Sequence, residues 1–171
     1  MRRFLKNYTS DVPVSKTISR IEAVLIKCGV TGITKEYGPT GEVTAIRFHI
    51  PVAGRELTVR LPANKEKALT ALWLDYADGE VLTEKGDAVE HYQGDRYSGK
   101  KKRKVDFAEQ AERTAWKIVQ DWIEVQMSMI QLNQADTLEV FLPYVWDGTA
   151  TVYSRLKDSG FRALLPETAG T

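Results

Sequence analysis

The spacing of apolar residues along the chain changes near residue 30, and the change separates a predicted helix from predicted strands. Between Ser15 and Gly29 apolar residues recur every three or four positions, which predicts a helix with one buried stripe. We expect Ser15 to cap this helix and Gly29 to end it. Residues 4 to 14 are expected to be extended, because Pro13 disfavours helical geometry in the residue before it. The stripe consists of Ile18, Ile21, Leu25 and Cys28.

Residues 32 to 61 alternate between apolar and polar side chains, which is the pattern of half-buried antiparallel strands. Glycine and proline gather at residues 38 to 41 and 51 to 54, so we expect turns there. The segment therefore predicts a three-stranded meander. Its polar face is expected to carry Arg47, His49 and Arg60.

Helical spacing returns after residue 62. Asn64 is expected to cap a helix that ends near Ala77. A long amphipathic helix is predicted at about residues 106 to 133, where Asp106 and Glu109 have the spacing of a capping box. The main apolar stripe of the long helix is expected at Ala108, Ala111, Ala115, Ile118, Trp122, Val125, Met129 and Leu132, and it is widened by Trp116, Val119, Ile123 and Ile130.

Two shorter helical segments complete the predicted fold. Asp136 and Glu139 have capping-box spacing before a short segment that ends near Pro143, and a last helix is expected from Thr151 to Ser159. The predicted class is α+β: helix, three-stranded antiparallel meander, helix, long amphipathic helix, short C-terminal helices. Residues 78 to 104 show no convincing period, so we expect a single domain, 1–171, with a mobile charged loop at about 78–104.

Composition and charge narrow the class of protein. Apolar residues make up 43% of the 171 residues and the net charge is +1, so any attraction to a polyanion must be local. No uncharged apolar run approaches the roughly 20 residues that span a bilayer, and no signal peptide is recognisable. The single cysteine, Cys28, excludes an internal disulfide. These features predict a cytoplasmic protein with no membrane partner.

The sharpest chemical feature is a run of five adjacent cations near the end of the predicted loop. Such cations repel one another and gain most from contact with a polyanion, whose counterions they release. An alternative interpretation remains open, because six acidic residues between 78 and 95 would neutralise the loop internally. The basic run is Lys100, Lys101, Lys102, Arg103 and Lys104, preceded by Arg96, and weaker candidates for the same nucleic-acid contact are Lys16, Arg20 and Arg47.

The sequence gives little support for catalysis. His49 and His91 are the two histidines and lie far apart in the sequence, no cysteine pair exists for zinc, and no phosphate-binding loop or nucleophile elbow is present. Cys28 is interpreted as a packed core thiol. We therefore predict no catalytic residue, no metal site and no cofactor, and a metal-dependent nuclease is the least supported alternative.

Three segments of the chain resemble a family of small uncharacterised phage and prophage proteins. They are residues 7–10 leading into 14–22, residues 111–122 and residues 139–144. The resemblance implies the cytoplasm of a bacterial host cell and carries no catalytic residues.

Two hypotheses follow. The first is a non-enzymatic phage or mobile-element accessory protein that contacts DNA or RNA through the basic run. The second is a protein-binding module, either an inhibitor of a host factor or a self-associating unit (a homo-oligomer), that uses the long amphipathic helix.

Overall fold

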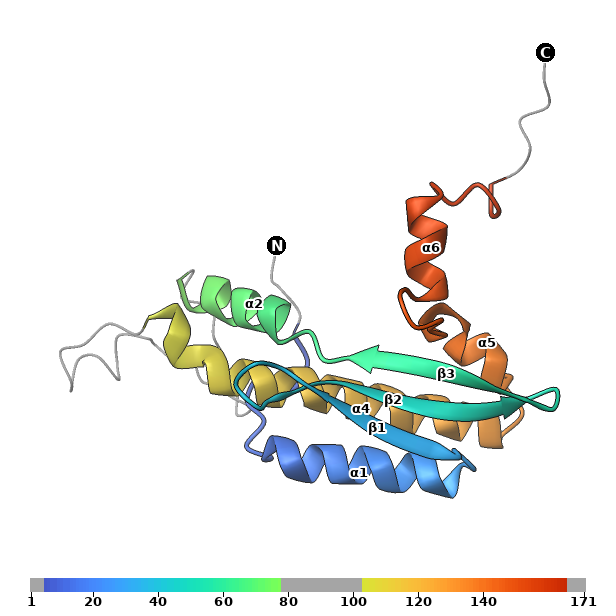
Figure 1. The fold of residues 1–171 in the computed structure, drawn as a ribbon. Coiled ribbons are helices and arrows are strands. Elements are labelled where there is room, and N and C mark those ends of the chain that lie inside the picture. The colour runs from blue at the N-terminus through green and yellow to red at the C-terminus, as the bar shows by residue number, and fades with distance from the viewer. Residues whose placement is uncertain (1–4, 78–102, 166–171) are drawn as a thin grey trace, which may run out of the picture. The chain divides into compact units, whose positions relative to one another are not determined.

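The computed structural model describes residues 5–77 and 103–165, and within them it confirms the predicted α+β class (Figure 1). Three antiparallel strands follow the first helix, and the long helix comes before three short helical segments. The elements in chain order are α1 (Val14–Lys27), β1 (Gly32–Tyr37), β2 (Val43–Val52), β3 (Arg55–Pro62), α2 (Lys65–Ala77), the 3₁₀ turn η1 (Lys104–Phe107), α4 (Ala108–Gln131), α5 (Thr137–Phe141), the 3₁₀ turn η2 (Leu142–Tyr144) and α6 (Val152–Asp158).

The chain groups into two compact units. The first contains Met1–Val24 and Ala63–Val125, and the second contains Leu25–Pro62 and Gln126–Thr171. The predicted loop lies outside the described residues except for its last two positions, and Lys104 already belongs to η1. The prediction of a single domain stays a prediction. None of the helices within residues 5–77 and 103–165 has the combination of length and hydropathy that a membrane span requires.

The second unit contains the sheet, with strand order β1-β2-β3 and antiparallel pairing throughout. Arg47 pairs with Thr34 on one side and with Arg60 on the other, so the three side chains lie on the same face. The outer edge of β3 is partly covered, because Val59 forms an isolated bridge with Val145. The predicted polar face is therefore one row of side chains across all three strands.

The opposite face of the sheet forms the core of the second unit. Phe48 on β2 and Phe141 on α5 are both fully buried, and their rings meet edge to face at 5.4 Å. This arrangement suits aromatic quadrupoles. Ile46, Ile50 and Val59 are also buried, as the alternation predicts.

The first unit packs α2 against the beginning of α4. Ala111 and Ala115 of α4 lie against Ala68 and Leu72 of α2, and small side chains on both helices allow the close approach. Phe107 extends this contact, since its ring lies 5.0 Å from that of Tyr76. The residues just before α4 are therefore held by packing on α2.

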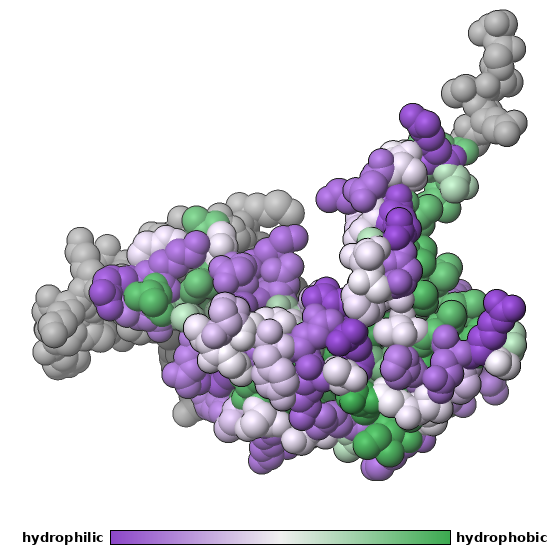
Figure 2. Space-filling view, in the orientation of Figure 1, coloured by the Kyte–Doolittle hydropathy of each residue, from purple (hydrophilic) through white to green (hydrophobic). Residues whose placement is uncertain are grey.

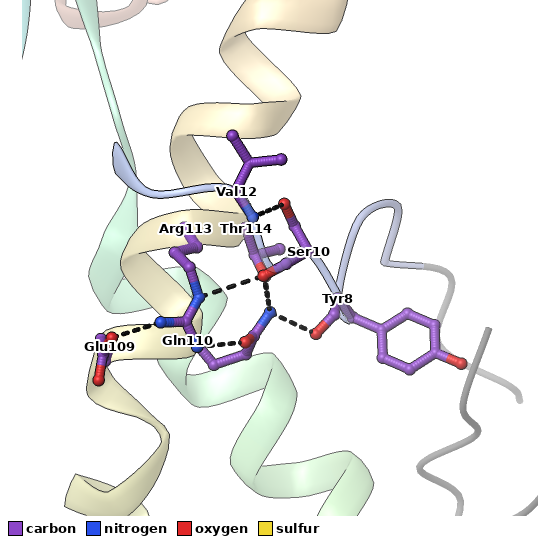
Figure 3. Close-up of polar contacts among 7 residues, drawn as sticks. All are labelled: Tyr8, Ser10, Val12, Glu109, Gln110, Arg113 and Thr114. Atoms are coloured by element: carbon purple, nitrogen blue, oxygen red, sulfur yellow. Dashed lines mark hydrogen bonds and ion pairs between the residues drawn. The ribbon is translucent and has the colours of Figure 1, made fainter. Parts of the chain in front are cut away.

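The N-terminal segment of the first unit is anchored to α4 by side chains that bind its carbonyl groups (Figure 3). Gln110 donates from Nε2 to the carbonyls of Tyr8 at 2.8 Å and Ser10 at 3.2 Å. Arg113 Nε also donates to the Ser10 carbonyl, and Thr114 donates to the carbonyl of Asn7. The expectation of an extended segment is wrong. Residues 6–9 form a turn, because these side chains satisfy carbonyls that a strand would otherwise pair.

Several predicted helix ends are confirmed. Gly29 has φ +83° and ends α1, while the Val30 N–H donates to the Leu25 carbonyl at 3.2 Å, as in a Schellman motif. Asn64 accepts from the N–H of Lys67 and caps α2. Asp136 caps α5 in a capping box with Glu139. The last helix, α6, begins one residue later than expected, with Thr151 as its cap.

Two predicted helix starts are wrong. α1 begins at Val14, since the Pro13 carbonyl already accepts from the N–H groups of Lys16 and Thr17, so Ser15 is inside the helix. Asp106 does not cap α4. Its carboxylate instead reaches back to the Arg103 N–H at 2.6 Å, one turn earlier.

The buried face of α4 also differs from the predicted stripe. Ala111 and Ala115 are buried as expected, but Val125 is 55% exposed and Leu132 is 67% exposed. Trp116 and Ile123 are buried as expected. Thr114, Gln120 and Met127 lie outside the predicted stripe and are buried as well. The helical period was right, but after Ala115 the burial shifts from the main stripe to the side of the residues that were expected to widen it.

Candidate nucleic-acid interface

The predicted basic run is described at its last two positions. Lys100, Lys101, Lys102 and Arg96 lie outside the described residues. Arg103 precedes η1, and its guanidinium lies 3.3 Å from the Asp106 carboxylate, although its side chain remains 79% exposed. An ion pair this exposed is screened by solvent, so Arg103 stays available to a polyanion.

Lys104, the last residue of the basic run, contacts α2 through its side chain. Its Nζ donates to Thr70 Oγ1 at 3.3 Å, and Thr70 lies on the exposed side of α2. Lys67, one helical turn before Thr70, is exposed on the same side. The structure thus brings Lys104 close to Lys67, which is not among the predicted contact residues. Their proximity depends on the packing of η1 against α2, which the sequence pattern does not show.

The candidates on α1 are Lys16 and Arg20, and both side chains are exposed. Neither has an ion-pair partner within residues 5–77 and 103–165. They belong to the first unit, as Arg103 and Lys104 do. Arg47 belongs to the second unit, where it takes part in a local cluster.

The cluster on the polar face of the sheet consists of Glu36, Arg47, Arg60 and Trp146, here called the sheet cluster. Arg60 holds the Glu36 carboxylate with two nitrogens, Nε at 3.0 Å and Nη2 at 2.7 Å. Arg47 Nε lies 3.0 Å from the same carboxylate, and its Cζ lies 5.0 Å from the centroid of the Trp146 ring. That distance is within the range of a cation–π interaction.

The cations lower the pKa of the Glu36 carboxyl. The hydrogen bond from Arg60 is the largest cause, it is opposed by burial, and the charges of Arg60 and Arg47 add to the lowering. Glu36 is therefore ionised at neutral pH. The sequence interpretation missed Glu36, because a shared face with Arg47 and Arg60 follows from the strand register and not from alternation alone.

The remaining polar face of the sheet is organised around His49. Its Nδ1 lies 3.1 Å from Thr58 Oγ1, and its ring lies over Gly32 on the neighbouring strand, where the Cβ of any larger residue would come within 2.9 Å of the ring. Gly32 thus leaves the space that the imidazole fills. The contacts of His49 are those of a packed strand residue.

A pocket of about 160 Å³ lies in the second unit beside Cys28. Cys28 is half-buried, and Gln131 Nε2 approaches its Sγ at 3.9 Å, so the interpretation as a packed core thiol is wrong. Cys28 lies between the last residue of α1 and Gly29, so its side chain is at the end of the apolar stripe of that helix. The walls include Val30, Ile50, Pro51, Met127 and Ile130.

Among the residues that the structure describes, no three His, Cys, Asp or Glu side chains gather as metal ligands would. No family model matches this chain, and neither do curated proteins or solved structures. The resemblance to phage and prophage proteins stays a prediction.

Proposed function

We propose that this protein is a non-enzymatic accessory protein of a phage or mobile element, and that it contacts nucleic acid through the basic run. The contact between Lys104 and Thr70 carries the proposal. It holds the last cation of the run at the junction of η1 and α2, where Lys67 adds to the positive charge.

Local charge explains how a nearly neutral protein would bind a polyanion. The net charge of +1 gives no long-range attraction, but five adjacent cations release several phosphate counterions at once. Lys16 and Arg20 of the same unit are further exposed cations. Such binding weakens steeply as salt increases and depends little on base sequence.

Fluorescence anisotropy with labelled DNA and RNA tests the proposal, measured over a series of salt concentrations. In the test variant Lys100, Lys101 and Lys102 are changed to Gln. We expect its salt slope to fall by about 2 to 3, because each lost phosphate contact removes about 0.9 for duplex DNA. The matched control changes Arg55, Lys157 and Arg162 to Gln, which removes the same charge from exposed positions of the second unit.

The control variant should bind as the wild type does. The proposal is wrong if the wild type does not bind at low salt, or if the test and control variants weaken equally. An equal loss would mean that net charge, and not the basic run, attracts the nucleic acid.

The exposed apolar residues of the long helix favour a second function, a protein-binding or self-associating module. Val125 is 55% exposed on α4, and Leu132 directly after the helix is 67% exposed. The surface of α6 also presents hydrophobic side chains along one flank (Figure 2). Light scattering at high protein concentration tests self-association, and a strict monomer would leave a different protein as the partner.

A further inference from the structure

The sheet cluster contains two arginines and one carboxylate, and it keeps an excess positive charge. Arg60 already binds both oxygens of Glu36, with Nε at 3.0 and 3.1 Å and Nη2 at 2.7 Å. Arg47 is an additional cation at the same carboxylate. Its Nε lies 3.0 Å from Glu36 Oε1 but is buried without a hydrogen bond.

The outer edge of the Arg47 guanidinium is available. Within the described residues neither Nη atom of Arg47 donates a hydrogen bond, and 31% of the side chain is exposed. The fork of a guanidinium matches the paired oxygens of a phosphate, to which it donates two parallel hydrogen bonds. Arg47 therefore has both the charge and the free donors that a phosphate requires.

Trp146 holds Arg47 in position. The Trp146 backbone N–H donates to the Thr58 carbonyl at 2.8 Å, and the same residue forms a bridge with Thr151. The backbone of Trp146 is thus attached to the edge of β3, and the centroid of its ring lies 5.0 Å from Arg47 Cζ. A cation held between an aromatic ring and a carboxylate loses little conformational entropy when it binds a ligand.

We infer that Arg47 is a phosphate-binding residue that receives a phosphodiester of a nucleic-acid strand. This inference rests on the proposed function, which supplies a phosphate polyanion as the partner. Arg60 directly across the strand pair adds positive potential, while the other acid of this face, Glu56, lies farther along β3 and accepts from Thr31 at 2.7 Å. Trp146 and Glu36 act as positioning residues, since they orient Arg47 and do not contact the phosphate.

NMR of the arginine side chains tests the site directly. The resonances of Arg47 Nε and Nη are followed during titration with pyrophosphate and, separately, with a short single-stranded oligothymidylate. We expect both probes to shift the Arg47 resonances and to leave those of Arg55 unchanged. Arg55 is an exposed arginine at the hairpin tip of the same sheet and serves as the internal control.

Binding of the oligothymidylate to Arg47 variants separates the contribution of the planar guanidinium from that of its positive charge. Arg47→Lys keeps the charge but loses the fork, so we expect about tenfold weaker binding with an unchanged salt slope. Arg47→Gln should also lower the salt slope by about 0.7, the value for one phosphate of a single strand.

Trp146→Leu should weaken binding of the oligothymidylate without changing the salt slope, and Arg55→Gln should not alter the Arg47 resonances. Thermal unfolding verifies that each variant is folded.

The outcomes distinguish this inference from the proposed function. If the oligothymidylate binds but the Arg47 variants match Arg55→Gln, the inference is wrong and the proposed function stands. If the oligothymidylate does not bind, the inference is wrong whether or not pyrophosphate shifts the Arg47 resonances, and the labelled DNA and RNA then decide the proposed function. A shift with a glutamate-rich peptide and with neither phosphate probe would overturn the inference in favour of a carboxylate partner.

Discussion

Asn7 and Asp121 are 114 positions apart in the sequence, and a hydrogen bond of 3.0 Å joins the Asn7 amide to the Asp121 carboxylate. Lys6 lies 2.9 Å from the same carboxylate, and Lys117 donates to its other oxygen at 2.8 Å. The N-terminal segment is thus fixed to α4 by charge-assisted contacts as well as by the carbonyl contacts of Gln110. Charge-assisted hydrogen bonds are stronger than neutral ones, so we expect the stability of this unit to depend on Asp121.

We predict that Asp121→Asn lowers the free energy of unfolding by about 1 kcal/mol at neutral pH, after allowance for solvent screening. Burial raises the pKa of Asp121, but the hydrogen bonds from Lys117, Lys6 and Asn7 outweigh it and lower the pKa from 3.8 to about 2. A lowered pKa in the folded state stabilises the protein above the unfolded pKa. This stabilisation is lost as the pH falls from about 4 to about 2.

Urea unfolding at a series of pH values measures the effect. The wild type and Asp121→Asn should differ in stability at neutral pH and converge at low pH. A difference that persists unchanged at about pH 2 would mean that the carboxylate charge is not the cause. Glu109→Gln is the control, since the Glu109 side chain is 84% exposed and its pairing with Arg113 should contribute little.

The second prediction concerns Gln110. Gln110→Ala removes the donor of two hydrogen bonds to the Tyr8 and Ser10 carbonyls, so it should destabilise the protein by about 1 to 2 kcal/mol. The N-terminal segment should exchange its amide hydrogens faster, and the sheet should keep its protection. Hydrogen exchange measures both. Uniform loss of protection in both units would contradict a local role.

The third prediction concerns the turn between β2 and β3. Ala53 has φ +49° and Gly54 has φ +76°, the geometry of a type I′ turn. Ala53→Asn should stabilise the protein by about 0.5 to 1 kcal/mol, because asparagine tolerates a positive φ better than alanine. Thermal unfolding measures the change. Ala53→Val should destabilise, and stabilisation by valine would contradict the assigned backbone geometry.

The fourth prediction concerns the core of the second unit. Phe141→Ala should lower the free energy of unfolding by about 3 to 5 kcal/mol, because a fully buried ring leaves a cavity beside Phe48. Phe141→Leu retains most of the volume and should cost much less. Urea unfolding of both variants gives the comparison. A loss below about 1 kcal/mol for alanine would mean that α5 does not seal this core.

The predictable parts of the fold were those that depend on local chemistry. Gly29, Asn64 and Asp136 end or cap their helices as expected, because these signals act within a few residues. The error at Asp106 has the same origin. Asp106 lies three residues before Glu109, which is the spacing of a capping box. The Asp106 carboxylate instead accepts from the Arg103 N–H and so closes a turn that begins three residues earlier.

Burial on α4 could not be predicted from its period. Two neighbouring faces of the helix both carry apolar residues, and periodicity does not distinguish which one packs. The structure buries Thr114 and Gln120 and exposes Val125 and Leu132. Thr114 is placed inside because its hydroxyl binds the Asn7 carbonyl, a contact between distant parts of the chain.

The sequence by itself determined the α+β class, the three-stranded meander, the positions of most helix caps and the basic run. These follow from side-chain period, turn chemistry and adjacent charge, which all act over short distances. Tertiary structure alone decided that Lys104 reaches Thr70, that Arg60 and Arg47 share Glu36, and that the Trp146 ring lies against the Arg47 guanidinium. Those contacts depend on strand register and on packing between distant segments, where a shift of one residue would place every side chain on the other face.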